Sequence, residues 1–216
     1  SEMCIRDRRT VSDADATAHS VGGVQVHTGS TGLAHVAAPT VEAAIDQVRS
    51  LLAYLPLNNR AASPLGADTG VGVDPQAQAA LDLDTFMPDD DAAAYDVADI
   101  IGAVTDADFF ELGASYASNV VTGFAHLGGR AIGVVATQPS VLAGCLTHNG
   151  ARKAARFIRT CDSFNLPIVQ FVDCPGFVPS TDEEHAGATA GAAALAYAFA
   201  EAQVGTITVI LSLIHI

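Results

Sequence analysis

The segment IVQFVDCPGFVP at residues 168–179 says more about the fold than any other part of the chain. Its first six residues are mainly apolar and β-branched, which predicts a buried strand over residues 168–173. The Pro175-Gly176 pair that follows predicts a turn. Loops at the carboxyl ends of strands are where open α/β sheets bind ligands. Residues 173–177 are therefore either a ligand-binding loop or a plain turn with Phe177 as an anchor in the core.

Strands and helices alternate on either side of this segment. The Gly128-Gly129 pair between two apolar runs predicts a hairpin with strands at residues 119–127 and 130–136. Apolar periodicity predicts helices and one more strand at the following places: helices at residues 91–104, 149–161 and 186–202, and a strand at 206–210. Strands and helices that alternate with short connections predict an α/β domain with helices packed against a sheet.

A second candidate site is the turn Ala143-Gly144-Cys145, which lies before the helix expected from residue 149. Small residues let backbone N–H groups approach a ligand, and the N-terminus of a helix carries partial positive charge that favours an oxyanion. Tight turns use the same residues, so the motif is also compatible with a purely structural role.

A third candidate is the helix face that carries Arg152, Arg156 and Arg159, spaced at i, i+4 and i+7, with Lys153 beside them. Arginines in this arrangement can bind phosphate, but we expect a solvated or ion-paired face. Four acidic residues could also act in acid–base chemistry, although no spacing selects a pair: Asp173, Asp182, Glu183 and Glu184. We expect the last three to form an exposed loop.

Several function classes lack their motifs. The chain has no H-E-x-x-H, G-x-S-x-G, Walker or G-x-G-x-x-G sequence, which argues against zincins, hydrolase triads, P-loop enzymes and Rossmann dehydrogenases. Cys145, Cys161 and Cys174 form no C-x-x-C pair, so we predict reduced, buried thiols and no metal site.

The 216 residues include 24 acidic and 10 basic ones, for a net charge of -14, which argues against nucleic acid or an anionic membrane as a partner. The longest late uncharged run, residues 186–200, is shorter than the roughly 20 residues that a membrane span needs. We therefore expect a soluble protein.

The first half of the chain predicts one helix and a linker. Residues 40–55 show helical apolar spacing, with Thr40 as the cap and Pro56 after the end. Residues 63–91 are acidic and rich in Pro, Gly and Ala, which predicts a solvated linker. Their aspartates do not have the spacing of a calcium loop.

Both ends of the chain are expected to be foreign to the fold. Residues 3–8 and 211–216 can be translated back into DNA strings that are reverse complements, as a library adapter would leave. We expect residues 1–8 and 211–216 to derive from such an adapter and the remainder to be an interior fragment. The alternative is that residues 211–216 extend the strand before them.

Five motifs in order carry a family resemblance: NVVTGF at residues 119–124, GVVATQP at 133–139, AGCL at 143–146, KAARFIRTCD at 153–162 and FVDCPGFVP at 171–179. Together they resemble the carboxyltransferase (β) subunit of biotin-dependent acyl-CoA carboxylases of the propionyl-CoA and acetyl-CoA type. GGVQVH at 22–27 and LLAYLPLNN at 51–59 resemble the end of that family's N-terminal domain. The resemblance implies that residues 9–62 end the N-terminal domain, 63–91 are the acidic linker, and 92–210 begin the C-terminal domain.

The resemblance implies a crotonase-like (ClpP/crotonase) ββα spiral, truncated here, and transfer of a carboxyl group from carboxybiotin to the α-carbon of a short acyl-CoA. Paired backbone N–H groups hold the two oxyanions in this family, and losing one such donor costs about 3 to 4 kcal/mol of transition-state stabilisation. The implied cofactor is biotin on a partner subunit or domain, with no metal in this chain. The implied partners are a biotin carboxylase or carrier subunit and further copies of the subunit, in the cytoplasm.

Two departures from the family pattern bear on the site. The family's two oxyanion turns are expected outside this chain, so we expect the isolated chain to have no turnover. Residues 147–150 replace an acidic turn, and residues 189–193 replace charged ones.

Only one set of site residues is carried over, as walls of the biotin-side pocket: Gly144, Cys145, Pro175, Gly176 and Phe177. Two alternatives remain open, namely a biotin-dependent decarboxylase subunit of a sodium pump and a non-catalytic scaffold paralogue.

Overall fold

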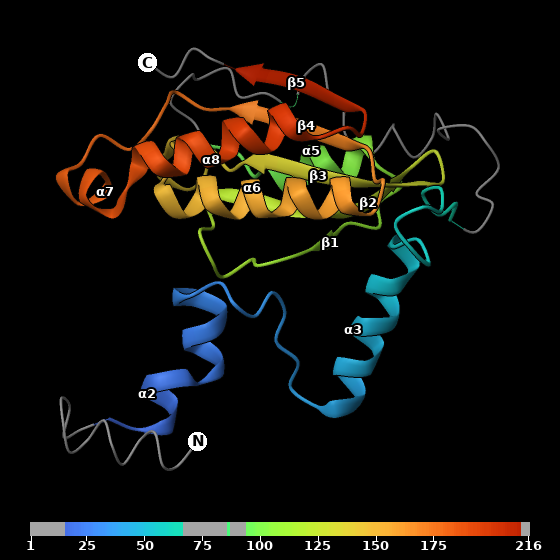
Figure 1. Ribbon diagram of the computed structural model, residues 1–216, viewed down its shortest axis with the longest axis horizontal. Helices are drawn as coiled ribbons and strands as arrows, with labels where there is room; N and C mark the ends of the chain where they lie inside the picture. Colours follow the sequence, from blue (N-terminus) through green and yellow to red (C-terminus); the bar gives the residue numbers. More distant parts are fainter. Residues whose placement is uncertain (1–15, 67–85, 87–93, 213–216) are drawn as a thin grey trace.

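The computed structural model describes residues 16–66, 86 and 94–212. Residues 94–212 form a sheet with helices on both faces, and residues 16–66 form an arm that projects from it (Figure 1). The elements of the arm are α2 (Ala18–Gly22), the π-helix η1 (Val26–Ser30) and α3 (Val41–Tyr54). The elements of the sheet domain are α5 (Val97–Val104), β1 (Phe110–Glu111), β2 (Val120–Leu127), β3 (Arg130–Thr137), η3 (Leu142–Gly144), α6 (His148–Ser163), β4 (Ile168–Asp173), α7 (Thr181–Ala186), α8 (Ala188–Glu201) and β5 (Thr206–Ser212).

The five strands follow one another in space in the order β1-β2-β3-β4-β5. The β1–β2 and β2–β3 pairs are antiparallel, and β3, β4 and β5 are parallel. The predicted hairpin is confirmed: Gly128 and Gly129 have φ values of 59° and 75°, as a type I′ turn requires at both central positions. Strand β4 has the predicted bounds, and β5 continues two residues beyond its expected end.

Helices α6 and α8 cover one face of the sheet, and α5 lies on the other (Figure 1). Strand residues alternate between two cores because successive side chains point to opposite faces. Val120 and Phe124 of β2 pack in the core that contains Ile158 of α6, whereas Val121 packs in the core that contains Ile101 of α5. The expected layered α/β architecture is therefore confirmed.

Three helix boundaries are set by their caps. Thr40 caps α3, where its Oγ1 accepts the Ala43 N–H at 3.2 Å, as predicted. The helix expected from residue 91 was predicted too long at its start, because Asp96 caps α5 and residues 94–96 are not helical. The single helix expected over residues 186–202 is wrong in one respect: Gly187, at φ 96°, separates α7 from α8.

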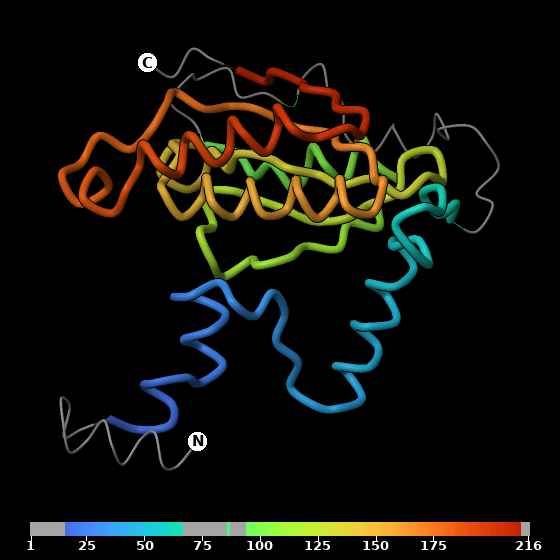
Figure 2. Tube along the Cα trace, viewed as in Figure 1, coloured from blue at the N-terminus to red at the C-terminus, as the bar shows by residue number. Residues whose placement is uncertain are grey.

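The arm touches the sheet domain through the end of α3. The ring of Tyr54 stacks on His126 with 4.8 Å between ring centroids and lies 6.1 Å from the ring of Phe124. The arm also touches the domain on either side of α3, because the Gly113 N–H donates to the His35 carbonyl at 2.8 Å and the Ser63 hydroxyl donates to the Ala131 carbonyl at 2.7 Å. Helix α2 and the start of α3 project away from the sheet (Figure 2). Most of the predicted linker, at residues 67–85 and 87–91, lies outside the described residues, as do residues 92–93 and residues 1–15 and 213–216 of the two ends.

Candidate functional site

Two of the three candidate segments meet beside the carboxyl ends of β3 and β4. The Leu146 N–H donates to the Gly176 carbonyl at 2.8 Å, and the Val178 N–H donates to the Leu146 carbonyl at 2.9 Å. Leu146 and Phe177 thereby form a parallel β-bridge between two loops that are about thirty residues apart in the sequence. The structure thus brings all five predicted site residues to one edge of the sheet, which we call the carboxyl-edge site.

The first loop contains a left-handed turn. Leu142, Ala143 and Gly144 have φ values of 53°, 50° and 73°, a conformation that costs roughly 1–2 kcal/mol for each residue other than glycine. A Cβ at Gly144 would lie 2.2 Å from the Asp173 carbonyl oxygen, so glycine is required here by the close approach of the loop to β4.

The backbone amides of this turn are used within it. The Gly144 N–H donates to the Val141 carbonyl at 3.1 Å, and the Cys145 N–H donates to the Leu142 carbonyl at 3.0 Å. The expectation that small residues here free these N–H groups for a ligand is wrong for both of them. Gly144 and Cys145 can still form a wall of the site.

The N-terminus of α6 is occupied by a carboxylate of the chain itself. Glu183 Oε2 accepts the His148 backbone N–H at 2.6 Å and lies 3.0 Å from His148 Nδ1. Burial acts to raise the pKa of Glu183, but the hydrogen bonds from His148 lower it overall. The loop expected at residues 182–184 is wrong, because these residues lie in the first turn of α7. Asp182 and Glu184 are exposed as expected, whereas only 18% of the Glu183 side chain is exposed.

The second loop presents an open surface. Gly176 has φ 143°, a Cβ added to it would have no atom within 4 Å, and Phe177 follows it with 39% of its surface exposed. Cys174 Sγ lies 3.3 Å from the Gly176 carbonyl, and burial raises the pKa of its thiol. Of the three predicted buried thiols, Cys161 is buried, whereas Cys145 and Cys174 are half-buried.

A cavity of about 250 Å³ lies beside these loops. Its walls are mainly apolar and come from Leu146, Val172, Cys174 and Leu195, among others, while Gln170 contributes a polar group. Mainly apolar walls with a few polar groups are typical of small-molecule pockets, and the volume of this cavity lies below their usual range of roughly 300–1,000 Å³.

A buried polar network supports the site from behind. Asp173 is 1% exposed and accepts a hydrogen bond from the Tyr95 hydroxyl at 2.9 Å. Thr137 Oγ1 both donates to the Asp173 carbonyl and accepts the Asp173 N–H, at 2.8 Å each. Burial and the adjacent Asp173 raise the pKa of Tyr95, which keeps its hydroxyl a donor. This network joins the ends of β3 and β4, and sequence reasoning missed Tyr95 and Thr137.

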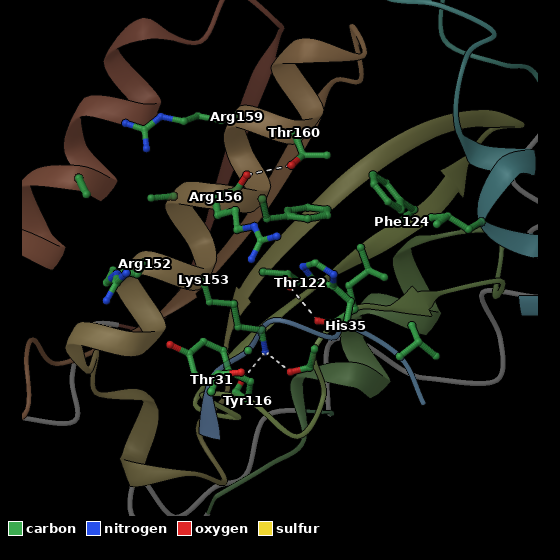
Figure 3. Close-up of a pocket in the computed structure, with 18 of the residues that line it drawn as sticks. Thr31, His35, Tyr116, Thr122, Phe124, Arg152, Lys153, Arg156, Arg159 and Thr160 are labelled. Carbon is green, nitrogen blue, oxygen red and sulfur yellow. Dashed lines mark hydrogen bonds between the residues drawn. The ribbon is translucent and has the colours of Figure 1, made fainter. Parts of the chain in front are cut away.

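A larger cavity, of about 510 Å³, runs along α6 on the side of the arm (Figure 3). The three predicted arginines, Arg152, Arg156 and Arg159, all line it. Arg159 has the expected ion pair, with its Nε 2.6 Å from Glu201 Oε1. The guanidinium groups of Arg156 and Arg152 have no hydrogen bond or ion pair with any residue that the structure describes.

The expectation that Lys153 lies on a solvated face is wrong. It is 9% exposed, and its Nζ donates to the carbonyls of Gly113 and Tyr116 at 2.8 Å and of Val120 at 2.6 Å. Burial lowers the pKa of Lys153 to about 8, and Glu111 opposes this shift. The side chain thus fastens the loop between β1 and β2 to α6 (Figure 3).

The described residues contain neither a cluster of metal-binding side chains nor a membrane-spanning helix. Within residues 16–66 and 94–212, His, Cys, Asp and Glu do not gather in groups of three or more that could hold a metal ion. Across the same residues, the helices are all too short or too polar to cross a bilayer.

Comparison with known proteins gives consistent results. A family model described as "Carboxyl transferase domain" matches residues 8–213. The chain is 45% identical over 205 residues to the biotin-dependent acetyl-/propionyl-coenzyme A carboxylase beta5 subunit of Mycobacterium tuberculosis, a match that covers 94% of this chain and 37% of that protein. It is 42% identical over 203 residues to the methylmalonyl-CoA decarboxylase subunit alpha of Veillonella parvula, a match that covers 94% of this chain and 39% of that protein.

Among solved structures, the transcarboxylase 12S hexamer with methylmalonyl-coenzyme A and methylmalonic acid bound superposes with a TM-score of 0.89. The sequence identity is 39%, and the match covers 95% of this chain and 40% of that chain. The expected α/β fold of the crotonase type is confirmed by this similarity. The chain spans about two fifths of the length of the relatives that it matches.

Proposed function

The chain belongs to the carboxyl transferase domain family, and from this premise we propose that the protein it represents transfers a carboxyl group from carboxybiotin to the α-carbon of a short acyl-CoA. Acceptors of the propionyl-CoA and acetyl-CoA class are favoured by the 45% identity to the Mycobacterium tuberculosis subunit. The observation that carries the proposal is the carboxyl-edge site, where two loops of the family motif meet through the Leu146–Phe177 bridge.

The carboxyl-edge site suits the ring of biotin. Biotin has a fused ring that is largely apolar and bears a polar ureido group, and the 250 Å³ cavity combines apolar walls with Gln170. None of the five predicted site residues lines this cavity itself, but they lie in the same two loops as its lining residues Leu146 and Cys174. We propose that these five residues complete the wall that holds the ring: Gly144, Cys145, Pro175, Gly176 and Phe177. Carboxybiotin supplies the carboxyl group and the base for the reaction when it is bound.

The residues of this chain would act by position. Phe177 would cover the ring and exclude water from it, because a large exposed aromatic side chain gains by packing on an apolar ligand. Gly176, with open space beside its α-carbon, would let a ligand approach the backbone. Thr137 and Asp173 would hold the two strand ends at a fixed distance, so that the two loops keep their register.

We propose further that the division expected from the sequence applies, with residues 9–62 as the end of one domain, 63–91 as a linker and 92–210 as the start of a second. Biotin would be carried by a partner subunit or domain, and the active site would be shared between copies of the protein. The isolated 216-residue chain would then have no turnover of its own.

A decarboxylase is the second candidate function, favoured by the 42% identity to the Veillonella parvula subunit. In this function the transfer would run in the opposite direction, from a carboxylated acyl-CoA to biotin. The two functions are distinguished by the genes beside the parent gene, because a decarboxylase of a sodium pump requires membrane subunits.

The experiment that tests the proposal is a graft. Residues 9–210 would replace the matching segment of the full-length Mycobacterium tuberculosis beta5 subunit, and carboxylation of propionyl-CoA by free carboxybiotin would be measured. The proposal predicts turnover by the grafted subunit and none by the isolated chain. A grafted subunit that assembles like its parent but does not carboxylate propionyl-CoA would contradict the proposal.

A further inference from the structure

We propose that the 510 Å³ cavity along α6 binds an aliphatic monocarboxylate, with Arg156 paired to the carboxylate and the tail packed against apolar side chains of α3, β2 and α6. We call it the α6 cavity. It shares no lining residue with the 250 Å³ cavity of the carboxyl-edge site. Its volume lies within the roughly 300–1,000 Å³ of small-molecule pockets. The ligand would therefore bind beside, and independently of, the site of carboxyl transfer.

The lining of the α6 cavity is cationic. It includes three arginines, Lys153 and His35, and it contains no Asp or Glu among the described residues. Lys153 is already satisfied by three backbone carbonyls, and Arg159 is paired with Glu201. In a chain with a net charge of -14, a cavity without a carboxylate is unusual, and it favours an anion as its ligand.

Arg156 is the group that can receive this anion. Its guanidinium extends toward the centre of the cavity, whereas Arg152 and Arg159 extend away from the centre (Figure 3). The guanidinium makes no hydrogen bond or ion pair with any described residue. Such a group presents paired N–H donors that match the two oxygens of a carboxylate.

His35 faces Arg156 across the cavity. Burial lowers the pKa of His35, and the charges of Arg156 and Lys153 lower it further, so its ring is neutral at pH 7. A bound carboxylate between the two side chains would offset these cations. One unpaired guanidinium beside a neutral imidazole matches a single negative charge better than the two charges of a phosphate.

The remaining walls are apolar. Leu51 and Leu55 come from α3 and the residue after it, Phe124 from β2 and Phe157 from α6. Phe124 and Phe157 are already buried in the core, whereas Leu51 and Leu55 are only partly buried. An inorganic anion would leave the exposed parts of the two leucines in water, whereas an aliphatic tail would cover them and gain from the burial of each CH₂ group. The two kinds of wall together select an amphiphile with an acidic head and an aliphatic tail.

Calorimetry with decanoate on the 216-residue chain tests the proposal. We expect saturable 1:1 binding with a negative heat-capacity change, and weaker binding by at least about tenfold for decanol, which lacks the charge, and for inorganic phosphate, which lacks the tail. Arg156→Gln should weaken decanoate binding by about tenfold or more, since it removes a charged hydrogen bond. Arg130→Gln, which removes an exposed cation outside the cavity, is the matched control and should leave the affinity unchanged.

The position of the ligand has its own readout. Decanoate bound in the α6 cavity should raise the pKa of His35, followed by NMR titration of its ring, with His35→Gln to assign the signal. Equal binding of decanoate and decanol, equal affinity of the Arg156→Gln and parent chains, or an unchanged His35 titration at saturation would each overturn the proposal. Because the readouts need no carboxyl transfer, they are independent of the proposed function.

Discussion

Replacing Lys153 by methionine tests whether a buried ammonium holds the loop between β1 and β2. Methionine keeps the length and apolar character of the stem but cannot donate a hydrogen bond. The Tyr116 and Val120 carbonyls, which now accept at 2.8 and 2.6 Å, would lose the Lys153 donor. The Gly113 carbonyl would keep its bond from the Tyr116 N–H at 3.0 Å. The substitution therefore removes donors while leaving the packing nearly intact.

The size of the effect follows from two opposing terms. Two orphaned carbonyls at about 2 kcal/mol each would cost about 4 kcal/mol. Removing the buried charge returns its desolvation cost, which is about 3 kcal/mol for a pKa lowered from 10.5 to about 8. We therefore expect Lys153→Met to lower the free energy of unfolding by about 1 kcal/mol at pH 7.

Urea unfolding gives the global value, and amide hydrogen exchange gives the location. Exchange should speed up more at residues 112–119 than in β3 or β4, because only this loop loses its tie to α6. Arg130→Met, at an exposed position, is the control and should change stability by less than about 0.5 kcal/mol. A Lys153→Met chain as stable as its parent, with unchanged exchange in the loop, would refute the reasoning.

Three further predictions concern single groups. Lys153 is the only lysine of the chain, so NMR of its ¹³C-labelled ε-carbon should show a titration near pH 8. Between pH 8 and the ordinary lysine value the unfolded chain binds the extra proton, so stability should rise with pH. A titration near 10.5 would contradict this prediction. Glu183→Gln should lower the free energy of unfolding by about 1 kcal/mol at pH 7, because it weakens the bonds to His148. Since the pKa of Glu183 is lowered in the folded chain, the difference in unfolding free energy between parent and variant, measured in urea, should close as pH falls through that pKa. A difference that does not change with pH would contradict this prediction. Gly144→Ala should lower the free energy of unfolding by at least about 3 kcal/mol, because its Cβ would clash with the Asp173 carbonyl of β4. Gly128→Ala is the control, also at positive φ but with open space around it, and should cost only about 1 kcal/mol. Equal melting temperatures of the two variants would contradict the steric argument.

The local patterns in the sequence were sufficient for most of the sheet domain. Apolar runs predicted the bounds of β4, and the Gly128-Gly129 pair placed the hairpin, because both signals depend on neighbouring residues alone. The split at Gly187 was missed, since alanines on both sides continue the helical pattern and only the φ of 96° reveals the break.

The site was predicted less completely than the fold. The two loops of the carboxyl-edge site could be selected from the sequence, because each follows a strand. The use of the Gly144 and Cys145 amides inside the turn could not, since it depends on a left-handed turn that includes Leu142 and Ala143.

Burial of Lys153 is the clearest case of information that is absent from local sequence. Its neighbours in the helix are arginines, which indicate a solvated face. The carbonyls that accept from it lie 33 to 40 residues earlier in the chain, and no local pattern reports that they are close in space.

The most direct test of the carboxyl-edge site is the Michaelis constant for free carboxybiotin in the grafted beta5 subunit that carries Phe177→Ala. If Phe177 covers the biotin ring, KM for carboxybiotin should rise by about tenfold or more, as loss of an aromatic contact of about 1.5 kcal/mol implies, with KM for propionyl-CoA unchanged. A rise in KM for propionyl-CoA with KM for carboxybiotin unchanged would contradict the account.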